Sequence, residues 1–147
     1  SDPVMAGPVI QAAAETALTP EQHTILASGP TIVLAANDPA GPPHVTVSAY
    51  HWDGSTFSLP AQQFTLRASN VESDPRVSLF LEVPGTAVAM TGVATVVYGD
   101  AVADVMLRIL VRDADAGTAQ ARWEELRASG DRMIISVRPT RFVWLRR

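Results

Sequence analysis

Apolar and polar residues alternate with a period of two over most of the chain, which is the pattern of half-buried β-strands. Strands are predicted over 31–36, 44–52, 55–60, 76–83, 86–98 and 133–145, of which 31–36 is a short apolar run rather than an alternating one. Asp53-Gly54 and Pro84-Gly85 are typical turn dipeptides between them. The long segment 86–98 has small or apolar residues on both faces, which implies burial on both sides, and a second subunit could supply one of the two covers.

The segment 44–52 has two faces of different character. One face holds Val45, Val47 and Ala49, and the other holds His44, Thr46, Ser48, Tyr50 and Trp52. Because the first set is apolar throughout, we expect it to point into the interior of the protein.

Helical signals interrupt this pattern at four places. Thr19, Pro20 and Gln22 form a capping box and a helix start, and Ser28-Gly29 predicts its end, with the glycine in the left-handed conformation. Further helices are predicted over 63–73, 100–111 and 114–128. The prediction is therefore a mainly β protein with appended helices, a six-stranded antiparallel barrel, because closure removes unpaired strand edges. Residues 1–17 are expected to form a flexible arm before one domain, 18–147.

Composition excludes several kinds of chemistry. The chain has 147 residues and no cysteine, which excludes disulfides and thiolate metal sites. All 11 basic residues are arginine, so no lysine can form a Schiff base. A net charge of −4 gives no support for nucleic-acid binding, and no apolar run approaches the roughly 20 residues of a membrane helix. A cytoplasmic location is expected because no signal peptide is visible.

Candidate chemistry concentrates between Leu59 and Arg76. His44 and His51 are seven residues apart in a predicted strand and point to opposite faces, so no metal site is predicted. Thr65 and Arg67, by contrast, stand near the start of a short helix, where free N–H groups and a guanidinium favour a phosphate. The alternative is a surface arginine beside a capping threonine, and these residues alone do not decide between the two. No catalytic acid or base is assigned.

Residues Pro30 to Val83 resemble the pyridoxamine 5'-phosphate oxidase-like, FMN-binding split β-barrel family. The resemblance lies in a strand, a Gly-Pro turn, the hairpin 50–54, a basic segment around Arg67, then Asn70 and residues 74–77. It implies that Thr65, Leu66 and Arg67 lie against the cofactor phosphate. It also implies that Val47, Ser48 and Ala49 run beside the isoalloxazine ring, with Leu59, Pro60 and Ala61 as another wall.

Two departures from the family pattern concern the basic segment. Arg67 stands where a lysine is common, which keeps the charge and changes the geometry. A second neighbouring basic residue is absent, with Leu66 and Ser69 in the nearby positions. The phosphate would then be held weakly or with help from an arginine of a second subunit.

The resemblance further implies a homodimer with two cofactor clefts at its interface. The expected function is FMN-dependent transfer of a hydride or electrons to a small-molecule redox substrate. One alternative is a deazaflavin coenzyme on the same fold. The alanine-rich composition, with arginine and no lysine, suggests a GC-rich genome of the kind in which that coenzyme is used, which is an association only. A second is a non-catalytic flavin-binding or carrier protein. Oxidation of pyridoxamine phosphate itself ranks last, because no arginine and histidine cluster for a substrate phosphate is evident.

Overall fold

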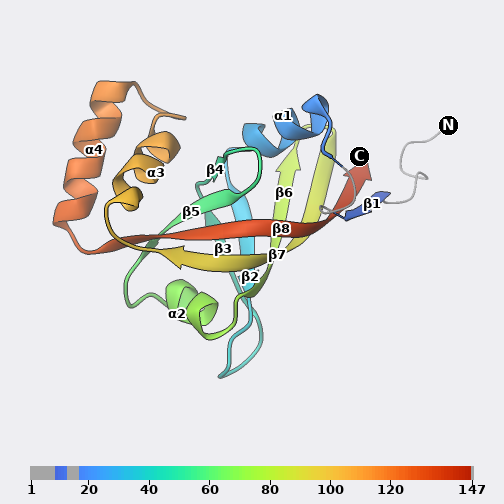
Figure 1. The fold of residues 1–147 in the computed structure, drawn as a ribbon, viewed down its shortest axis with the longest axis horizontal. Helices are drawn as coiled ribbons and strands as arrows, with labels where there is room; N and C mark the ends of the chain where they lie inside the picture. Colours follow the sequence, from blue (N-terminus) through green and yellow to red (C-terminus); the bar gives the residue numbers. More distant parts are fainter. Residues whose placement is uncertain (1–8, 13–16, 147) are drawn as a thin grey trace.

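The computed structural model describes residues 9–12 and 17–146. Eight strands form one antiparallel sheet (Figure 1), and they are β1 (Val9–Ala12), β2 (Ile32–Ala36), β3 (His44–Ser48), β4 (His51–Trp52), β5 (Phe57–Gln62), β6 (Arg76–Val83), β7 (Thr86–Val97) and β8 (Arg132–Arg146). Four helices accompany them, namely α1 (Pro20–Ser28), α2 (Leu66–Ser73), α3 (Ala101–Leu110) and α4 (Ala116–Ala128). None of these described helices is long and apolar enough to cross a membrane.

The sheet curls into a barrel that is open along one side. Its strand order is β3-β2-β6-β7-β8-β5-β4, and β1 pairs with β8 off this path. The chain passes from β3 to β4 through Ala49 and Tyr50, yet in the described sheet no ladder joins β3 to β5. The mainly β, split antiparallel barrel predicted from the sequence is therefore confirmed, with two strands more than the six expected.

The core has two parts that share the sheet. Along β2, β6, β7 and β8, buried residues mostly alternate with residues that point outward. The buried residues pack around Tyr50, Phe57 and Phe142. A second cluster joins α3 and α4 to β8 through Met106, Trp123 and the fully buried Ile134. The α3–α4 hairpin is thereby docked at one end of the barrel (Figure 1).

The first helix begins as predicted and ends differently. Thr19 accepts a hydrogen bond from Gln22 N, and the Gln22 side chain accepts one from Thr19 N, which completes the capping box. Gly29 has φ −67° and ψ 143°, so the predicted left-handed conformation is wrong. Close packing favours glycine here instead, because a Cβ would lie 2.3 Å from Leu81 Cδ1, so the buried leucine side chain would have to move.

The predicted interior face of 44–52 is also wrong. Val45 is 60% and Val47 is 65% exposed, whereas Ser48 and Tyr50 on the other face are buried. The Tyr50 hydroxyl donates to Leu26 O at 2.7 Å and accepts from Gly29 N at 3.0 Å, so a polar side chain can occupy the core at full hydrogen-bond satisfaction. The apolar side chains of β3 are left facing outward.

The N-terminal segment departs from the prediction in one respect. No strand was expected before Leu18, but β1 pairs with β8, with Ile10 opposite Val143. Four residues hold too little alternation to predict a strand by themselves. Residues 1–8 and 13–16 of the predicted arm lie outside the described residues.

An apolar row crosses the outer face of the sheet. Directly paired residues point to the same face, and the register places six apolar side chains side by side on six strands. These residues, here called the apolar row, are Val47, Val33, Phe80, Ala89, Val143 and Ile10. Phe80 is 37% and Ile10 is 66% exposed, so this face is only partly covered within one chain.

Candidate functional site

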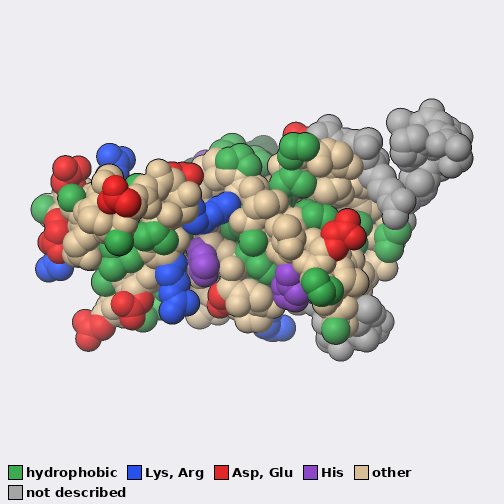
Figure 2. Space-filling model, turned by 90° about the horizontal axis from the view of Figure 1, so that it is seen from above, with side chains coloured by type: hydrophobic (Ala, Val, Ile, Leu, Met, Phe, Trp, Pro, Cys, Tyr) green, Lys and Arg blue, Asp and Glu red, His purple; other side chains and the backbone are tan. Residues whose placement is uncertain are grey.

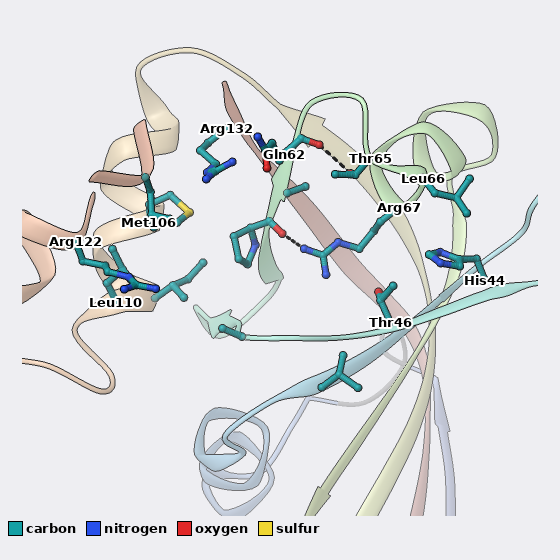
Figure 3. Close-up of a pocket in the computed structure, with 16 residues that line it drawn as sticks. His44, Thr46, Gln62, Thr65, Leu66, Arg67, Met106, Leu110, Arg122 and Arg132 are labelled. Atoms are coloured by element: carbon teal, nitrogen blue, oxygen red, sulfur yellow. Dashed lines mark hydrogen bonds between the residues drawn. The ribbon is translucent and has the colours of Figure 1, made fainter. Parts of the chain in front are cut away.

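The open side of the barrel contains a pocket of about 540 Å³, a size that accommodates a small organic ligand or cofactor. Strand β3 forms one side, β5 and the start of α2 form another, and the α3–α4 hairpin closes the end (Figure 3). The pocket is lined by His44, Thr46, Val47, Ala49, Pro60, Ala61, Gln62, Thr65, Leu66, Arg67, Met106, Ile109, Leu110, Arg122, Leu126 and Arg132. The pocket therefore exists because β3 and β5 do not pair.

Most of the residues predicted for a cofactor site lie around this pocket. Those that line it are Val47, Ala49, Pro60, Ala61, Thr65, Leu66 and Arg67. Ser48 and Leu59 do not: Leu59 is fully buried in the core, and Ser48 is buried with its hydroxyl donating to Ala49 O at 2.7 Å. Both side chains are thus buried away from the pocket, although Val47, Ala49 and Pro60 beside them line it.

Arg67 is a half-buried cation in the pocket wall. Its guanidinium donates to the Pro60 carbonyl, and the described residues give it no carboxylate partner. Burial lowers the pKa of the guanidinium, but an arginine stays protonated at neutral pH. The remaining donors of a charged group in partly apolar surroundings are suited to an anionic ligand.

Thr65 has a different role from the one its position suggested. Its hydroxyl caps α2 by accepting from Ala68 N at 3.3 Å, and it donates to Gln62 O at 2.8 Å. The side chain is thus already used within the chain. What α2 can offer to an anion is its first-turn N–H groups, those of Leu66 and Arg67, which have no intrahelical acceptor.

Thr46 is a lining residue that the sequence did not identify. Its Oγ1 is buried and has no hydrogen-bond partner in the described part of the chain. A buried hydroxyl without a partner costs roughly 1–3 kcal/mol, so such groups mark places where a partner is missing. Thr46 lies on the same strand as Val47, and Figure 3 shows its side chain near that of Arg67, which comes from α2.

The hairpin wall was also missed by the sequence analysis. Met106, Ile109 and Leu110 of α3, together with Leu126 of α4, give this end of the pocket an apolar surface. Their helical spacing predicted an amphipathic helix but gave no sign that part of its apolar stripe faces a pocket.

The charged side chains that line the pocket are all basic. Three arginines line it, Arg67, Arg122 and Arg132, and among the described residues no aspartate or glutamate does. The described residues contain no group of three or more His, Asp or Glu that could hold a metal ion. Apolar walls with several cationic groups suit a flat organic ligand that carries anionic substituents.

Comparison with known proteins identifies the family. The model of the family pyridoxamine 5'-phosphate oxidase matches residues 18–143, and the chain belongs to this family, whose members commonly bind flavins. The resemblance found in the sequence is thereby confirmed. No curated protein matches the chain significantly.

Solved structures of several kinds share the fold. A conserved hypothetical protein from Mycobacterium tuberculosis is 23% identical, with a TM-score of 0.76 over 92% of this chain and 89% of that one. An F420 reductase is 24% identical, with a TM-score of 0.61 over 84% and 98%. The heme storage protein HutZ from Vibrio cholerae is 20% identical, with a TM-score of 0.68 over 88% and 96%. At these identities the likeness shows the fold alone.

Proposed function

We propose that this protein is an oxidoreductase that holds FMN, or a deazaflavin coenzyme in its place, in the pocket between β3 and β5. The observation that carries the proposal is Arg67, a half-buried guanidinium without a carboxylate partner in the wall of an otherwise largely apolar pocket. A flavin phosphate supplies the anion, and the tricyclic ring needs the apolar surface. The residues present therefore fit the group.

Individual residues have distinct parts in this proposal. Arg67 and the first-turn N–H groups of α2 hold the phosphate, and Thr46 gains the hydrogen-bond partner that it lacks within the described chain. Val47, Ala49 and Pro60 exclude water from the ring. When bound, such a coenzyme supplies the hydride or electron transfer, which the protein does not need to perform with its own acid or base.

The alternatives differ in the cofactor and in whether catalysis follows. The F420 reductase among the similar folds supports the deazaflavin alternative, and the heme storage protein supports a non-catalytic carrier. The three lining arginines favour a ligand with anionic groups in every case. FMN stays first because the family commonly binds flavins.

A binding experiment with Thr46→Val tests the proposal. FMN and F420 are titrated separately into wild-type protein and into this variant, with binding followed by chromophore absorbance and fluorescence. The isosteric change removes only the unpartnered hydroxyl. We therefore expect the free energy of unfolding of the free protein to stay the same or rise, and the coenzyme to bind severalfold more weakly. Thr95 is exposed on β7 and does not line the pocket, so Thr95→Val should alter neither stability nor coenzyme binding. Failure of both coenzymes to bind wild-type protein would overturn the proposed function.

We also propose that the apolar row is the interface of a homodimer. Six adjacent apolar side chains across the sheet leave an outward face that one chain covers only in part. Exposed contiguous apolar patches typically mark protein interfaces. Val47 belongs both to this row and to the pocket lining, so a second subunit on this face would also border the cofactor site.

Ala89→Arg is therefore expected to convert a dimer into a folded monomer. Ala89 lies in the middle of the apolar row with its side chain outward, so a guanidinium there would be desolvated without a partner on association. Thr95→Arg, on the same face of the same strand, is the control and should stay dimeric. Light scattering gives the mass. A wild-type monomer, or a dimer that survives Ala89→Arg, would contradict this placement of the interface.

A further inference from the structure

We propose that Arg122 and Arg132 form a second anion subsite, at the hairpin end of the pocket, which binds a carboxylate or phosphate group distinct from the one at Arg67. This inference rests on the proposed function, because it concerns the same pocket. It adds a requirement on the ligands: taken together, the molecules that fill the pocket carry two separate anionic groups.

Both arginines face the pocket from the side opposite Arg67. Arg122 stands in the middle of α4, and Arg132 is the first residue of β8. Figure 3 shows both side chains beside Met106 and Leu110, while Arg67 comes from α2 on the other side of the pocket. The two cationic ends are thus separated by apolar wall, which is where a ring system would lie.

The guanidinium groups of this pair are not neutralised by the chain. Arg122 makes no hydrogen bond or ion pair with any described residue, and Arg132 uses one donor on Ser129 Oγ at 3.0 Å. On the same helix, Arg127 approaches Glu124 at 3.8 Å. An arginine of α4 can therefore pair with a carboxylate of the same helix, but the carboxylates of α4 do not line the pocket that Arg122 faces.

The whole hairpin shows this separation of charge. Residues 101–128 include five acidic side chains, Asp104, Asp113, Asp115, Glu124 and Glu125, and none of them lines the pocket. In Figure 2, acidic side chains gather at the surface of the hairpin end, at the left of that view. The hairpin keeps its acidic side chains away from the pocket, and its one charged lining residue is the exposed Arg122. Such an arrangement is suited to an anion, because a guanidinium next to an apolar wall favours anionic groups.

Two sources can supply the second anion. It is either a further anionic group on the coenzyme itself or the acid group of a separate substrate that binds beside the coenzyme. The chemistry at Arg122 and Arg132 is the same in both cases. The experiment therefore has one arm for each source.

The test uses the double variant Arg122→Gln/Arg132→Gln, with Arg127→Gln as the matched control. In the first arm, FMN, with its phosphate alone, is compared with F420, whose tail carries carboxylates beyond its phosphate. A coenzyme source predicts at least tenfold weaker F420 binding in the double variant and FMN binding within twofold of wild type. In the second arm, inorganic phosphate is titrated calorimetrically into FMN-loaded protein. A substrate source predicts phosphate binding that the double variant loses.

The outcomes separate this inference from the proposed function. If FMN or F420 binds wild-type protein but neither arm responds to the double variant, the second subsite is overturned and the proposed function stands. If neither coenzyme binds wild-type protein, both are overturned. Arg127→Gln should match wild type in both arms, and an equal loss in that control would show a general charge effect and reject the subsite. Thermal unfolding within a few degrees of wild type establishes that the double variant is folded.

Discussion

Arg67→Glu is expected to weaken FMN binding by at least tenfold, the largest effect of any single change in the pocket. The substitution removes charge-assisted hydrogen bonds worth about 1.5–3 kcal/mol, which is roughly a 10- to 150-fold change in Kd. It also places a carboxylate against the phosphate, in a wall that among the described residues has no acidic group. Titration of the variant with FMN, followed by fluorescence, measures the change.

The controls for this prediction come from the same helix. Ser69→Glu adds a negative charge to an exposed position of α2 that does not line the pocket, and it should leave the Kd within twofold. Arg67→Lys keeps the charge with a different geometry and should bind better than the glutamate variant. Because Arg67 also donates to the Pro60 carbonyl, thermal unfolding of each variant is needed. An unchanged Kd in folded Arg67→Glu would remove Arg67 from the site.

The sequence predicts the elements better than it predicts which faces are buried. Alternation in 76–83 corresponds to β6, because Val77, Leu79 and Leu81 all point into the core. The segment 86–98, apolar or small on both faces, corresponds to β7. In 44–52 the same rule fails, since Tyr50 satisfies its hydroxyl inside the core while Val45 and Val47 face outward. A pattern of residue types cannot show that a polar group will find its partner 24 residues away in α1.

The candidate site is predictable on its β3 side and on the side formed by β5 and α2, but not at its hairpin end. Residues 59–67 are close in sequence, so turn and cap signals place Pro60, Ala61 and Arg67 near each other. Arg122 and Arg132 reach the pocket only because the hairpin docks on β8, a contact between distant parts of the chain. Thr46 has no sequence signal at all, because an unpartnered hydroxyl is a property of its three-dimensional surroundings.

Arg112, in the turn after α3, connects the hairpin to the barrel by hydrogen bonds. Its Nη1 donates to Tyr50 O at 2.9 Å, and its Nη2 donates to Ala27 O at 2.9 Å and Gly29 O at 2.6 Å. The guanidinium also lies 4.6 Å from the centre of the Tyr50 ring. One side chain thus joins the hairpin to the end of α1 and to the junction of β3 and β4. Because the hairpin forms the end wall, we expect Arg112 to act on the pocket as a positioning residue.

Arg112→Met is accordingly expected to lower the free energy of unfolding by about 3 kcal/mol and the Tm by roughly 6–12 °C. Methionine can cover part of the Tyr50 ring, but it leaves three carbonyls without their donor. Arg108→Met, on an exposed position one turn earlier, is the control and should change stability by less than about 0.5 kcal/mol.

A readout at the pocket separates local from global effects of Arg112→Met. If this residue holds the hairpin in place, coenzyme affinity should fall at 15 °C, where the variant is still fully folded, although Arg112 does not line the pocket. Arg112→Lys, which keeps a cation but cannot span the three carbonyls in the same way, should lie between the wild type and the methionine variant. A Tm equal to that of wild type would show that these hydrogen bonds do not hold the hairpin. A lower Tm with unchanged affinity would mean that the end wall is positioned by the apolar contacts of Met106 and Trp123 with Ile134 instead.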